Sequence, residues 1–183
     1  MFETIALAVA ATIFVFLAVV LTLAATKPNT FRVERSATIN AAPEAIFPIV
    51  NDFHRWIDWS PWEKLDPNLQ RTHGGAEQGV GATYAWEGNK KAGKGQMEIT
   101  ESLPASKIAI KLDFEKPFEA HNNVDFTFTL QGNATHVNWA MHGRQPFMLK
   151  VMSVFVSMDK LVGKDFEKGL VGLKSLAEEE TSK

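Results

Sequence analysis

Five histidines are the side chains in this sequence best suited to ligate a metal or carry a proton: His54, His73, His121, His136 and His142. None of them forms a His-Glu-x-x-His pair or a facial-triad spacing, the patterns that bring metal-ligating side chains together. The sequence also has no cysteine, which excludes disulfides, cysteine-ligated zinc and thiol catalysis. We therefore predict that the protein has no structural metal site.

Few titratable residues are expected to point inward, where a general acid or base would need to lie. Tyr84 falls on the apolar side of an alternating segment, and Glu87 lies near the end of that segment. Arg35 also falls on an apolar side, where it needs a carboxylate partner or an anionic ligand group, or must reach solvent at a sheet edge. We expect Arg35 to reach solvent. The other candidates alternate onto polar faces: Glu98, Asp113, Asp125, His136 and His142. No catalytic residue is predicted.

Charge is nearly balanced, with 19 basic and 21 acidic residues and a net charge of -2. Nucleic-acid binding depends on concentrated Lys and Arg, so no nucleic-acid partner is expected. No glycine-rich loop joins a strand to a helix, so no nucleotide cofactor is expected either. One basic loop, 88–95 with Lys90, Lys91 and Lys94, is either a solvated hairpin tip or a contact for anionic lipid, at about 1 kcal/mol per charge.

The N-terminal segment is far more apolar than the rest of the chain. From Ile5 to Ala25 only Thr12 and Thr22 interrupt a run of apolar residues. This length matches the roughly 20 residues that a helix needs to cross about 30 Å of hydrocarbon. A cleavable signal peptide is the alternative, but nothing basic precedes the run, and the run exceeds the roughly 7 to 15 apolar residues of a signal peptide. We predict a transmembrane anchor over residues 1–26.

The remaining boundaries follow from charge and composition. Lys27, Arg32 and Arg35 follow the apolar run, so the positive-inside rule predicts a single-pass protein whose domain lies in the cytoplasm. An exported domain, periplasmic or extracellular, is the alternative that a signal peptide would produce. Residues 27–30 are expected to be a linker, residues 31–178 one domain, and residues 179–183 a polar tail.

The domain begins with one strand and two helices in the sequence pattern. Residues 31–39 alternate in hydropathy, which predicts a strand with one buried face. Pro43 and Glu44 suit the first turn of a helix that continues to about Val50, and the aromatic-rich 53–62 predicts a second, short helix and a turn.

A period-two pattern with Gly and Pro punctuation then runs through residues 70–143 and predicts antiparallel strands with one wet and one buried face. The apolar positions are Tyr84, Trp86, Met97, Ile99, Ile108, Ile110, Leu112, Phe114, Val124, Phe126, Phe128, Leu130, Val137, Trp139 and Met141. Something must cover this apolar face.

The C-terminal segment is the one remaining stretch long enough to cover the sheet. Residues 147–179 contain no proline and carry apolar side chains at helical spacing, which predicts one long amphipathic helix. Gly163, Gly169 and Gly172 each cost about 1 kcal/mol relative to Ala inside a helix. We expect these small residues to let the sheet approach closely.

This order of elements resembles the START-like or SRPBCC superfamily, and within it the bacterial polyketide cyclase/dehydrase and lipid-transport group. Three local sequences carry the resemblance: RSATINAAPEAIF at 35–47, WIDWSPW at 56–62 and GKDFEKGLVGLK at 163–174. The resemblance covers about residues 31–178. It implies an α+β helix-grip fold, in which a curved antiparallel sheet wraps around a long C-terminal helix, here preceded by one N-terminal transmembrane helix.

The resemblance further implies an apolar cavity between helix and sheet, because the long helix leaves part of the sheet uncovered. The expected lining residues are Trp59, Trp62, Tyr84, Trp86, Met97, Phe126, Phe128, Trp139, Met141, Met152 and Phe155. Ordinary core packing is the alternative for each of them. Trp56, Trp59 and Trp62, spaced three residues apart, form either a lid over the cavity or the packing of a short helix.

Our leading hypothesis is a membrane-tethered protein that binds or transports a hydrophobic small molecule or lipid without a cofactor. Members of the superfamily also include enzymes and co-chaperones, so fold does not settle activity. A polyketide cyclase/dehydratase-like enzyme would need two polar or titratable side chains converging in the cavity. A co-chaperone-like protein-interaction module would need an exposed apolar patch beyond a few hundred Å². The sequence indicates neither the ligand nor the oligomeric state.

Overall fold

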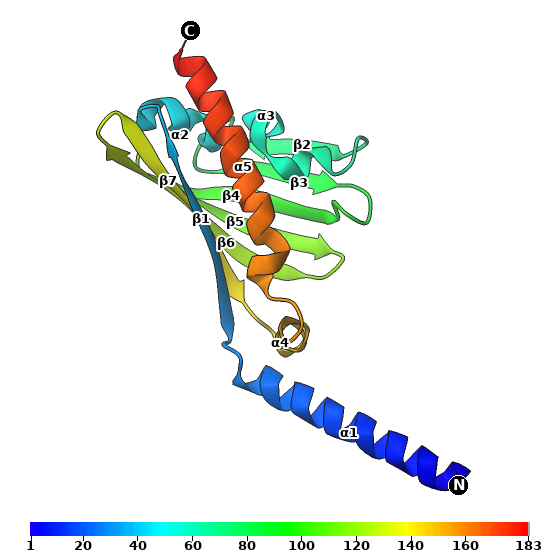
Figure 1. The fold of residues 1–183 in the computed structure, drawn as a ribbon. Helices are drawn as coiled ribbons and strands as arrows, with labels where there is room; N and C mark the ends of the chain where they lie inside the picture. Colours follow the sequence, from blue (N-terminus) through cyan, green and yellow to red (C-terminus); the bar gives the residue numbers. More distant parts are fainter. Residues whose placement is uncertain (183) are drawn as a thin grey trace.

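A curved sheet of seven antiparallel strands forms the body of the protein in the computed structural model, which describes residues 1–182 (Figure 1). The strand order is β1-β7-β6-β5-β4-β3-β2, so β1 and β2 are the edges. The strands are β1 (Thr30–Ile39), β2 (Gln70–Gly75), β3 (Ala82–Glu87), β4 (Lys94–Leu103), β5 (Lys107–Lys116), β6 (Ala120–Gln131) and β7 (Ala134–Arg144). The predicted antiparallel sheet is confirmed.

Helices cover the concave face of this sheet. The connection from β1 to β2 consists of four short elements: α2 (Pro43–Asn51), the 3-10 turn η1 (Phe53–Arg55), α3 (Trp56–Trp59) and the 3-10 turn η2 (Pro61–Lys64). α5 (Met158–Thr181) crosses the concave face, packs mainly along β1 and also contacts α2, α3 and η2 (Figure 1). The helix-grip arrangement is therefore present as predicted.

The C-terminal helix is interrupted, so the prediction of one helix over 147–179 is wrong. A short helix α4 (Phe147–Ser153) is followed by residues 154–157 and then by α5. Ser157 has an extended backbone, and its hydroxyl accepts a hydrogen bond from the Lys160 amide at 3.3 Å. A Ser in this position starts a helix by satisfying one of its free amides, which is why α5 begins here.

The core lies between the concave face and the helices, and aromatic rings fill its centre. Trp139 on β7 is stacked between Phe126 on β6 and Phe166 on α5, with ring centroids 4.8 and 4.3 Å away. Trp59 meets Trp139 edge-on at 5.5 Å. Leu130 is an exception to the predicted inward face, because it lies one residue before the end of β6 and is 59% exposed.

Arg35 lies on the edge strand β1 with 27% of its side chain exposed, as expected, and it also pairs with carboxylates. Its guanidinium donates to Asp159 and Glu167 of α5, both at 2.7 Å. The hydrogen bond to Asp159, and then the one to Glu167, raise the pKa of Arg35 above its ordinary value. These ion pairs clamp α5 onto the edge strand β1.

Gly169 on α5 allows the close approach of the sheet that the sequence suggested, whereas Gly172 allows a close approach of α3 instead. A Cβ on Gly169 would lie 2.6 Å from Cζ3 of Trp139 on β7. A Cβ on Gly172 would lie 2.7 Å from the backbone oxygen of Trp59, a group that cannot rotate away. At these two positions glycine lowers the helical propensity of α5 but permits close packing against Trp139 and Trp59.

We expect Gly172→Ala to destabilise the protein. Alanine gains about 1 kcal/mol of helix propensity over glycine, but overpacking against a fixed backbone costs about 1–3 kcal/mol and the backbone must shift as well. Circular-dichroism melts of the detergent-solubilised full chain measure the change. Val171→Ala, at a side chain that is 65% exposed, is the control and should leave stability almost unchanged. Equal or greater stability of the Gly172 variant would contradict the close contact.

The N-terminal helix α1 (Phe2–Thr26) extends away from the sheet, and the C-terminus lies at the opposite end of the molecule (Figure 1). α1 is long and apolar enough to cross a membrane. Only 6% of its apolar 18-residue stretch is buried in the protein. A signal sequence satisfies the same measure. At the other end, α5 continues through the predicted polar tail as far as Thr181, whereas Lys183 lies outside the described residues.

Candidate ligand cavity

An apolar cavity of about 500 Å³ lies between α5, α4, η2 and the concave face of the sheet. Met97 on β4 and Leu112 on β5 are opposite each other in the strand register and form part of its floor. Met158, Val162 and Phe166 of α5 cover it from the other side. α5 packs mainly along β1, so the strands further across the sheet keep an uncovered apolar surface.

Seven of the eleven predicted lining residues do border this cavity. They are Trp62, Tyr84, Trp86, Met97, Trp139, Met141 and Met152. They come from η2, β3, β4, β7 and α4, which are separated in sequence and meet only through the sheet register and the course of the C-terminal segment.

The other four predicted residues lie elsewhere. Trp59, Phe126 and Phe128 belong to the packed core and do not border the cavity. Trp59 and Phe126 contact each other edge-on, and Phe128 packs against Phe47 of α2. Phe155 was expected inside, but it is 61% exposed because it falls in the break between α4 and α5 rather than on a continuous helix.

A polar cluster that the sequence analysis missed lies in the wall of the cavity. Glu63 of η2 has a side chain that is 5% exposed, and its two oxygens have different partners. Tyr84 donates its hydroxyl to Oε1 at 2.6 Å, and Arg71 on β2 donates Nε to Oε2 at 2.6 Å. Arg71 also donates to the backbone oxygens of Glu63 and Leu69. The cavity wall therefore holds a buried carboxylate with an ion-pair partner.

The cluster keeps Tyr84 and Arg71 in their protonated forms. Burial, and then the hydrogen bond to Glu63, raise the pKa of Tyr84 well above its ordinary value, so its hydroxyl stays protonated and acts as a donor. The hydrogen bond to Glu63 raises the pKa of Arg71 in the same way. Such a group can orient a polar part of a ligand or take part in proton transfer.

Glu63 gives little signal in the sequence alone. It follows the aromatic segment 53–62 and occupies the first turn of a short helix, where an acidic residue usually faces solvent. Its burial depends on Tyr84 and Arg71, which neighbouring strands bring beside η2. The one hint was the position of Glu63 directly after Trp62, at the end of the aromatic-rich segment.

Most of the exposed lining residues lie at one end of the cavity, which marks its mouth. They are Pro117, Phe118 and Glu119 between β5 and β6, and Pro146, Met148 and Met152 at or near α4. Leu65, 38% exposed, borders it on another side. The tryptophan series contributes differently: Trp62 lines the cavity, Trp56 borders it and donates to the Val50 oxygen, and Trp59 is core.

Residues 1–182 contain no group of three or more His, Asp or Glu side chains arranged to hold a metal ion. The polar groups that face the cavity are instead Ser60, Glu63, Tyr84, Glu119 and Asn122. The cavity is thus predominantly apolar with a few polar groups on its wall, the usual arrangement of a small-molecule site.

Comparison with known families decides the classification. The sequence profile described as "Polyketide cyclase / dehydrase and lipid transport" matches residues 30–178. The chain belongs to the polyketide cyclase/dehydrase and lipid transport family. The match spans the sheet and α5 and leaves out α1, so the N-terminal helix is an addition to the family domain. A search among curated proteins finds no significant match.

Solved structures share the fold of this family member. Protein CV1439 from Chromobacterium violaceum superposes with a TM-score of 0.58 at 15% identity, over 83% of this chain and 99% of that one. The Aha1 dimer from Colwellia psychrerythraea gives 0.54 at 15% identity, over 81% and 96%. The di-domain ARO/CYC StfQ from the steffimycin biosynthetic pathway gives 0.64 at 11% identity, over 84% of this chain and 53% of that one. At these identities the likeness shows the fold alone.

Proposed function

We propose that this family member binds or transports a hydrophobic small molecule or lipid in the cavity beneath α5, and that α1 tethers it to a membrane. The cavity carries the first part of the proposal. Its volume of about 500 Å³ falls within the ~300–1,000 Å³ range of small-molecule sites. Its aromatic and methionine walls suit an apolar ligand of variable shape.

The tether rests on α1. Its length and composition match a membrane span, and nearly all of its side chains are exposed, so the domain does not use this helix as core. Leaving so much apolar surface in water would be costly, and a bilayer removes that cost.

Native mass spectrometry of the detergent-solubilised full chain tests ligand binding. The protein is incubated with total bacterial lipid extract, and separately with palmitic acid, before transfer to the instrument. We expect an added mass that survives removal of the detergent. A chain that stays unliganded with both probes would count against the proposed binding role.

Cysteine labelling in intact cells tests the tether and its orientation. The chain has no native cysteine, so Leu130→Cys, at an exposed position in the domain, reports the location of the domain without background. We expect the protein in the membrane fraction after alkaline extraction, and labelling by a membrane-impermeant maleimide only after permeabilisation, because the basic residues after α1 favour a cytoplasmic domain. Labelling of intact cells would place the domain outside, and a shortened soluble protein would identify α1 as a signal peptide.

A second candidate function is catalysis of the cyclase/dehydratase type. The observation that favours it is the convergence of Glu63 and Tyr84 in the cavity wall, since such reactions need an inward acid or base. This function is tested by incubating the protein with 1-phenylbutane-1,3-dione in deuterated buffer. NMR then measures the rate of deuterium exchange at the carbon between the two carbonyls. Exchange that is accelerated by the protein and lost in Glu63→Gln would support catalysis. Exchange equal to that in buffer would leave Glu63 as a structural group.

A further inference from the structure

α4 has the reverse of the polarity expected for a helix at the surface of a soluble domain. Its one charged side chain, Lys150, is buried, while Phe147 and Met148 are 51% and 71% exposed. Met152 is 45% exposed, and Phe155 and Val156 extend the apolar surface beyond the helix. An exposed patch of large apolar side chains without charge marks a surface that meets something other than water.

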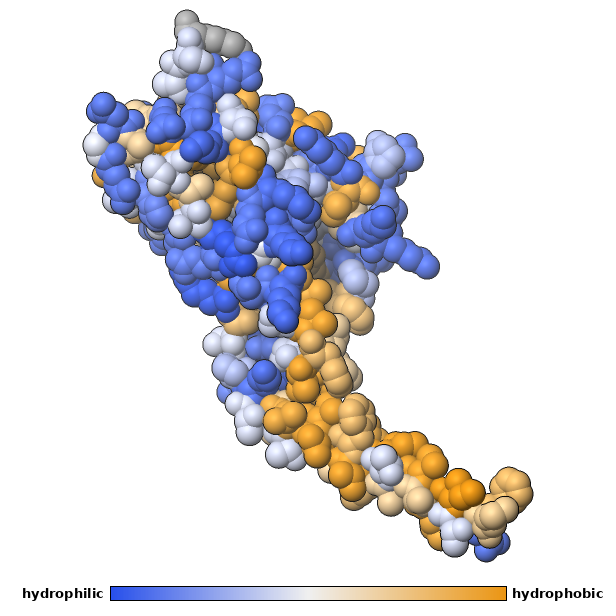
Figure 2. Space-filling view, viewed as in Figure 1, coloured by the Kyte–Doolittle hydropathy of each residue, from blue (hydrophilic) through white to orange (hydrophobic). Residues whose placement is uncertain are grey.

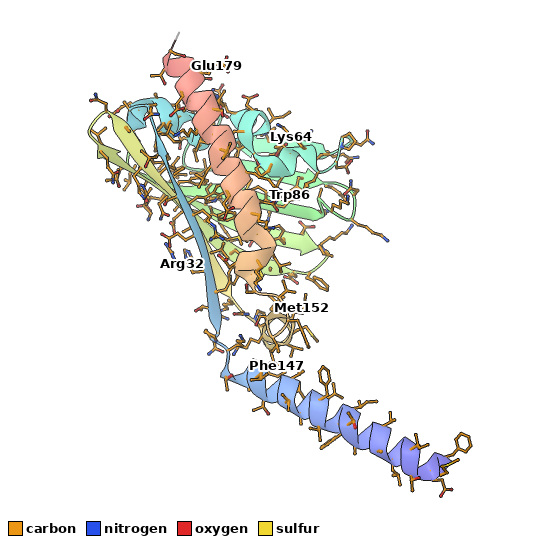
Figure 3. The ribbon with its side chains drawn as sticks, in the orientation of Figure 1. Arg32, Lys64, Trp86, Phe147, Met152 and Glu179 are labelled. Atoms are coloured by element: carbon orange, nitrogen blue, oxygen red, sulfur yellow. The ribbon has the colours of Figure 1, made fainter. Side chains whose placement is uncertain are left out.

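Lys150 fixes this orientation of α4. Its ammonium donates to the side-chain oxygen of Asn29 at 2.6 Å, and the Gln145 amide donates to the Asn29 backbone oxygen at 2.7 Å. Asn29 belongs to the short linker after α1, so these bonds hold α4 beside the root of the N-terminal helix. α4 also contacts α1 directly. Figure 3 shows Phe147 and Met152 on α4, between the body of the domain and α1.

The loop between β5 and β6 places a further exposed apolar side chain at the same end of the domain as α4. β6 begins at Ala120 beside the end of β7, since Asn122 pairs with Gly143, and β7 leads through Gln145 into α4. Phe118 in this loop is 66% exposed, and it lines the cavity together with Met148 and Met152. Figure 2 shows hydrophobic residues continuing from α1 onto the adjoining end of the domain, whereas the opposite end is largely hydrophilic.

We propose that this apolar rim, formed by Phe118, Phe147, Met148, Met152, Phe155 and Val156, rests in the surface of the bilayer that α1 crosses, so that the cavity takes up its ligand directly from the membrane. The inference rests on the proposed tether and ligand binding. Three features point to lipid as the occupant: the rim is continuous with a helix of membrane-spanning length, the one charged residue of α4 is turned inward, and the rim includes residues of the cavity mouth. Helices with an apolar face of this kind lie about 5–10 Å into the boundary between headgroups and acyl chains.

Single-cysteine labelling of the full chain in liposomes tests the contact. An environment-sensitive fluorophore is attached to Met148→Cys or Phe118→Cys, with Leu17→Cys in α1 and Leu130→Cys at the far end of β6 as references. The liposomes contain phosphatidylcholine with a spin-labelled acyl chain as quencher. We expect quenching at Leu17, Met148 and Phe118, and none at Leu130.

The outcomes separate the rim from the tether. Quenching at Leu17 alone would show that α1 crosses the membrane while the domain stands away from it, and would overturn the rim proposal. Loss of quenching at Leu17 as well would contradict the tether itself. A blue-shifted but unquenched label at Met148 would show that a protein surface, such as a second copy of the chain, covers the rim, and would also overturn the proposal.

Ligand uptake gives an independent measure. Full-length protein in nanodiscs is mixed with vesicles containing pyrene-labelled phosphatidylcholine, and uptake into the cavity is followed by energy transfer from the tryptophans to pyrene. Phe147→Glu/Phe155→Glu, at two exposed rim residues that do not line the cavity, should slow uptake about tenfold, because charged side chains oppose insertion at the boundary between headgroups and acyl chains. Leu130→Glu/Val171→Glu, which adds the same two charges at exposed sites outside the cavity, should leave the rate unchanged. Native mass spectrometry with detergent-dispersed palmitic acid should show normal binding to the rim variant. Equal uptake by both variants would overturn the proposal, and unchanged melting curves confirm folding.

Discussion

Replacing Met97 and Leu112 together with tryptophan is expected to reduce the fraction of protein that carries bound lipid at least tenfold. The two side chains face each other across β4 and β5 and border the cavity floor, so two indoles there occupy space that the ligand needs. Below saturation the loaded fraction falls in proportion to affinity, so a tenfold loss corresponds to about 1.4 kcal/mol of binding free energy. This is a modest loss for a ligand that must leave part of its volume outside the site. Native mass spectrometry with palmitic acid and with bacterial lipid extract measures the loaded fraction.

Folding should survive this change, because the new rings enter a void rather than a packed region. Leu130→Trp is the matched control, since it adds the same side chain at a position that is 59% exposed and outside the cavity. We expect normal loading in the control and similar melting curves in both variants. Undiminished loading of the folded double variant would show that lipid binds somewhere other than this cavity.

Removing the charge of Arg71 is expected to cause a large loss of stability. Arg71→Met retains most of the aliphatic length but leaves the Glu63 carboxylate, 5% exposed, with Tyr84 as its remaining side-chain hydrogen-bond partner. Breaking a buried ion pair typically costs 3–5 kcal/mol, and since Arg71 is itself 27% exposed we expect about 2–3 kcal/mol. Urea unfolding of the detergent-solubilised full chain measures the difference.

The sequence contains a matched control for this prediction. Arg32 and Glu34 form an ion pair of the same 2.6 Å length on β1, also an edge strand, but their side chains are 52% and 45% exposed. Surface pairs of this kind are worth about 0–1 kcal/mol, so Arg32→Met should change stability little. In addition, Glu63→Gln/Arg71→Met should recover much of the loss, because the amide keeps a hydrogen bond to Tyr84 without a buried charge. Equal effects of the two arginine substitutions would show that burial adds nothing to the Glu63 pair.

Much of the fold was readable from local pattern. Strand alternation depends on side chains pointing to opposite faces, so residues such as Ile99, Ile110 and Val137 were assigned to the buried face correctly. The glycines of α5 also carried information, since Gly169 was expected to permit close contact and lies against Trp139. The break before α5 was missed because the apolar spacing of residues 147–179 continues across it, and one capping residue, Ser157, outweighs that periodicity.

The site was readable only in part. Hydropathy and strand register indicate which side chains face inward, but they do not separate a packed core from a void. Trp139 and Phe126 share the same face of adjacent strands, yet only Trp139 borders the cavity. Whether a side chain meets a ring or an open space depends on where α5 crosses the sheet, and that position follows from contacts such as Arg35 with Asp159 and Glu167.

The sequence by itself determined the one-sided sheet, the helix that covers it and the apolar N-terminal segment, because each depends on periodicity or composition within a single stretch of chain. Tertiary structure alone decided the Glu63 cluster and the inverted polarity of α4. Both depend on partners far away in sequence: Tyr84 and Arg71 hold Glu63, and Asn29 turns Lys150 inward. A charged residue is buried only where the fold supplies such a partner, and no local pattern shows that partner in advance.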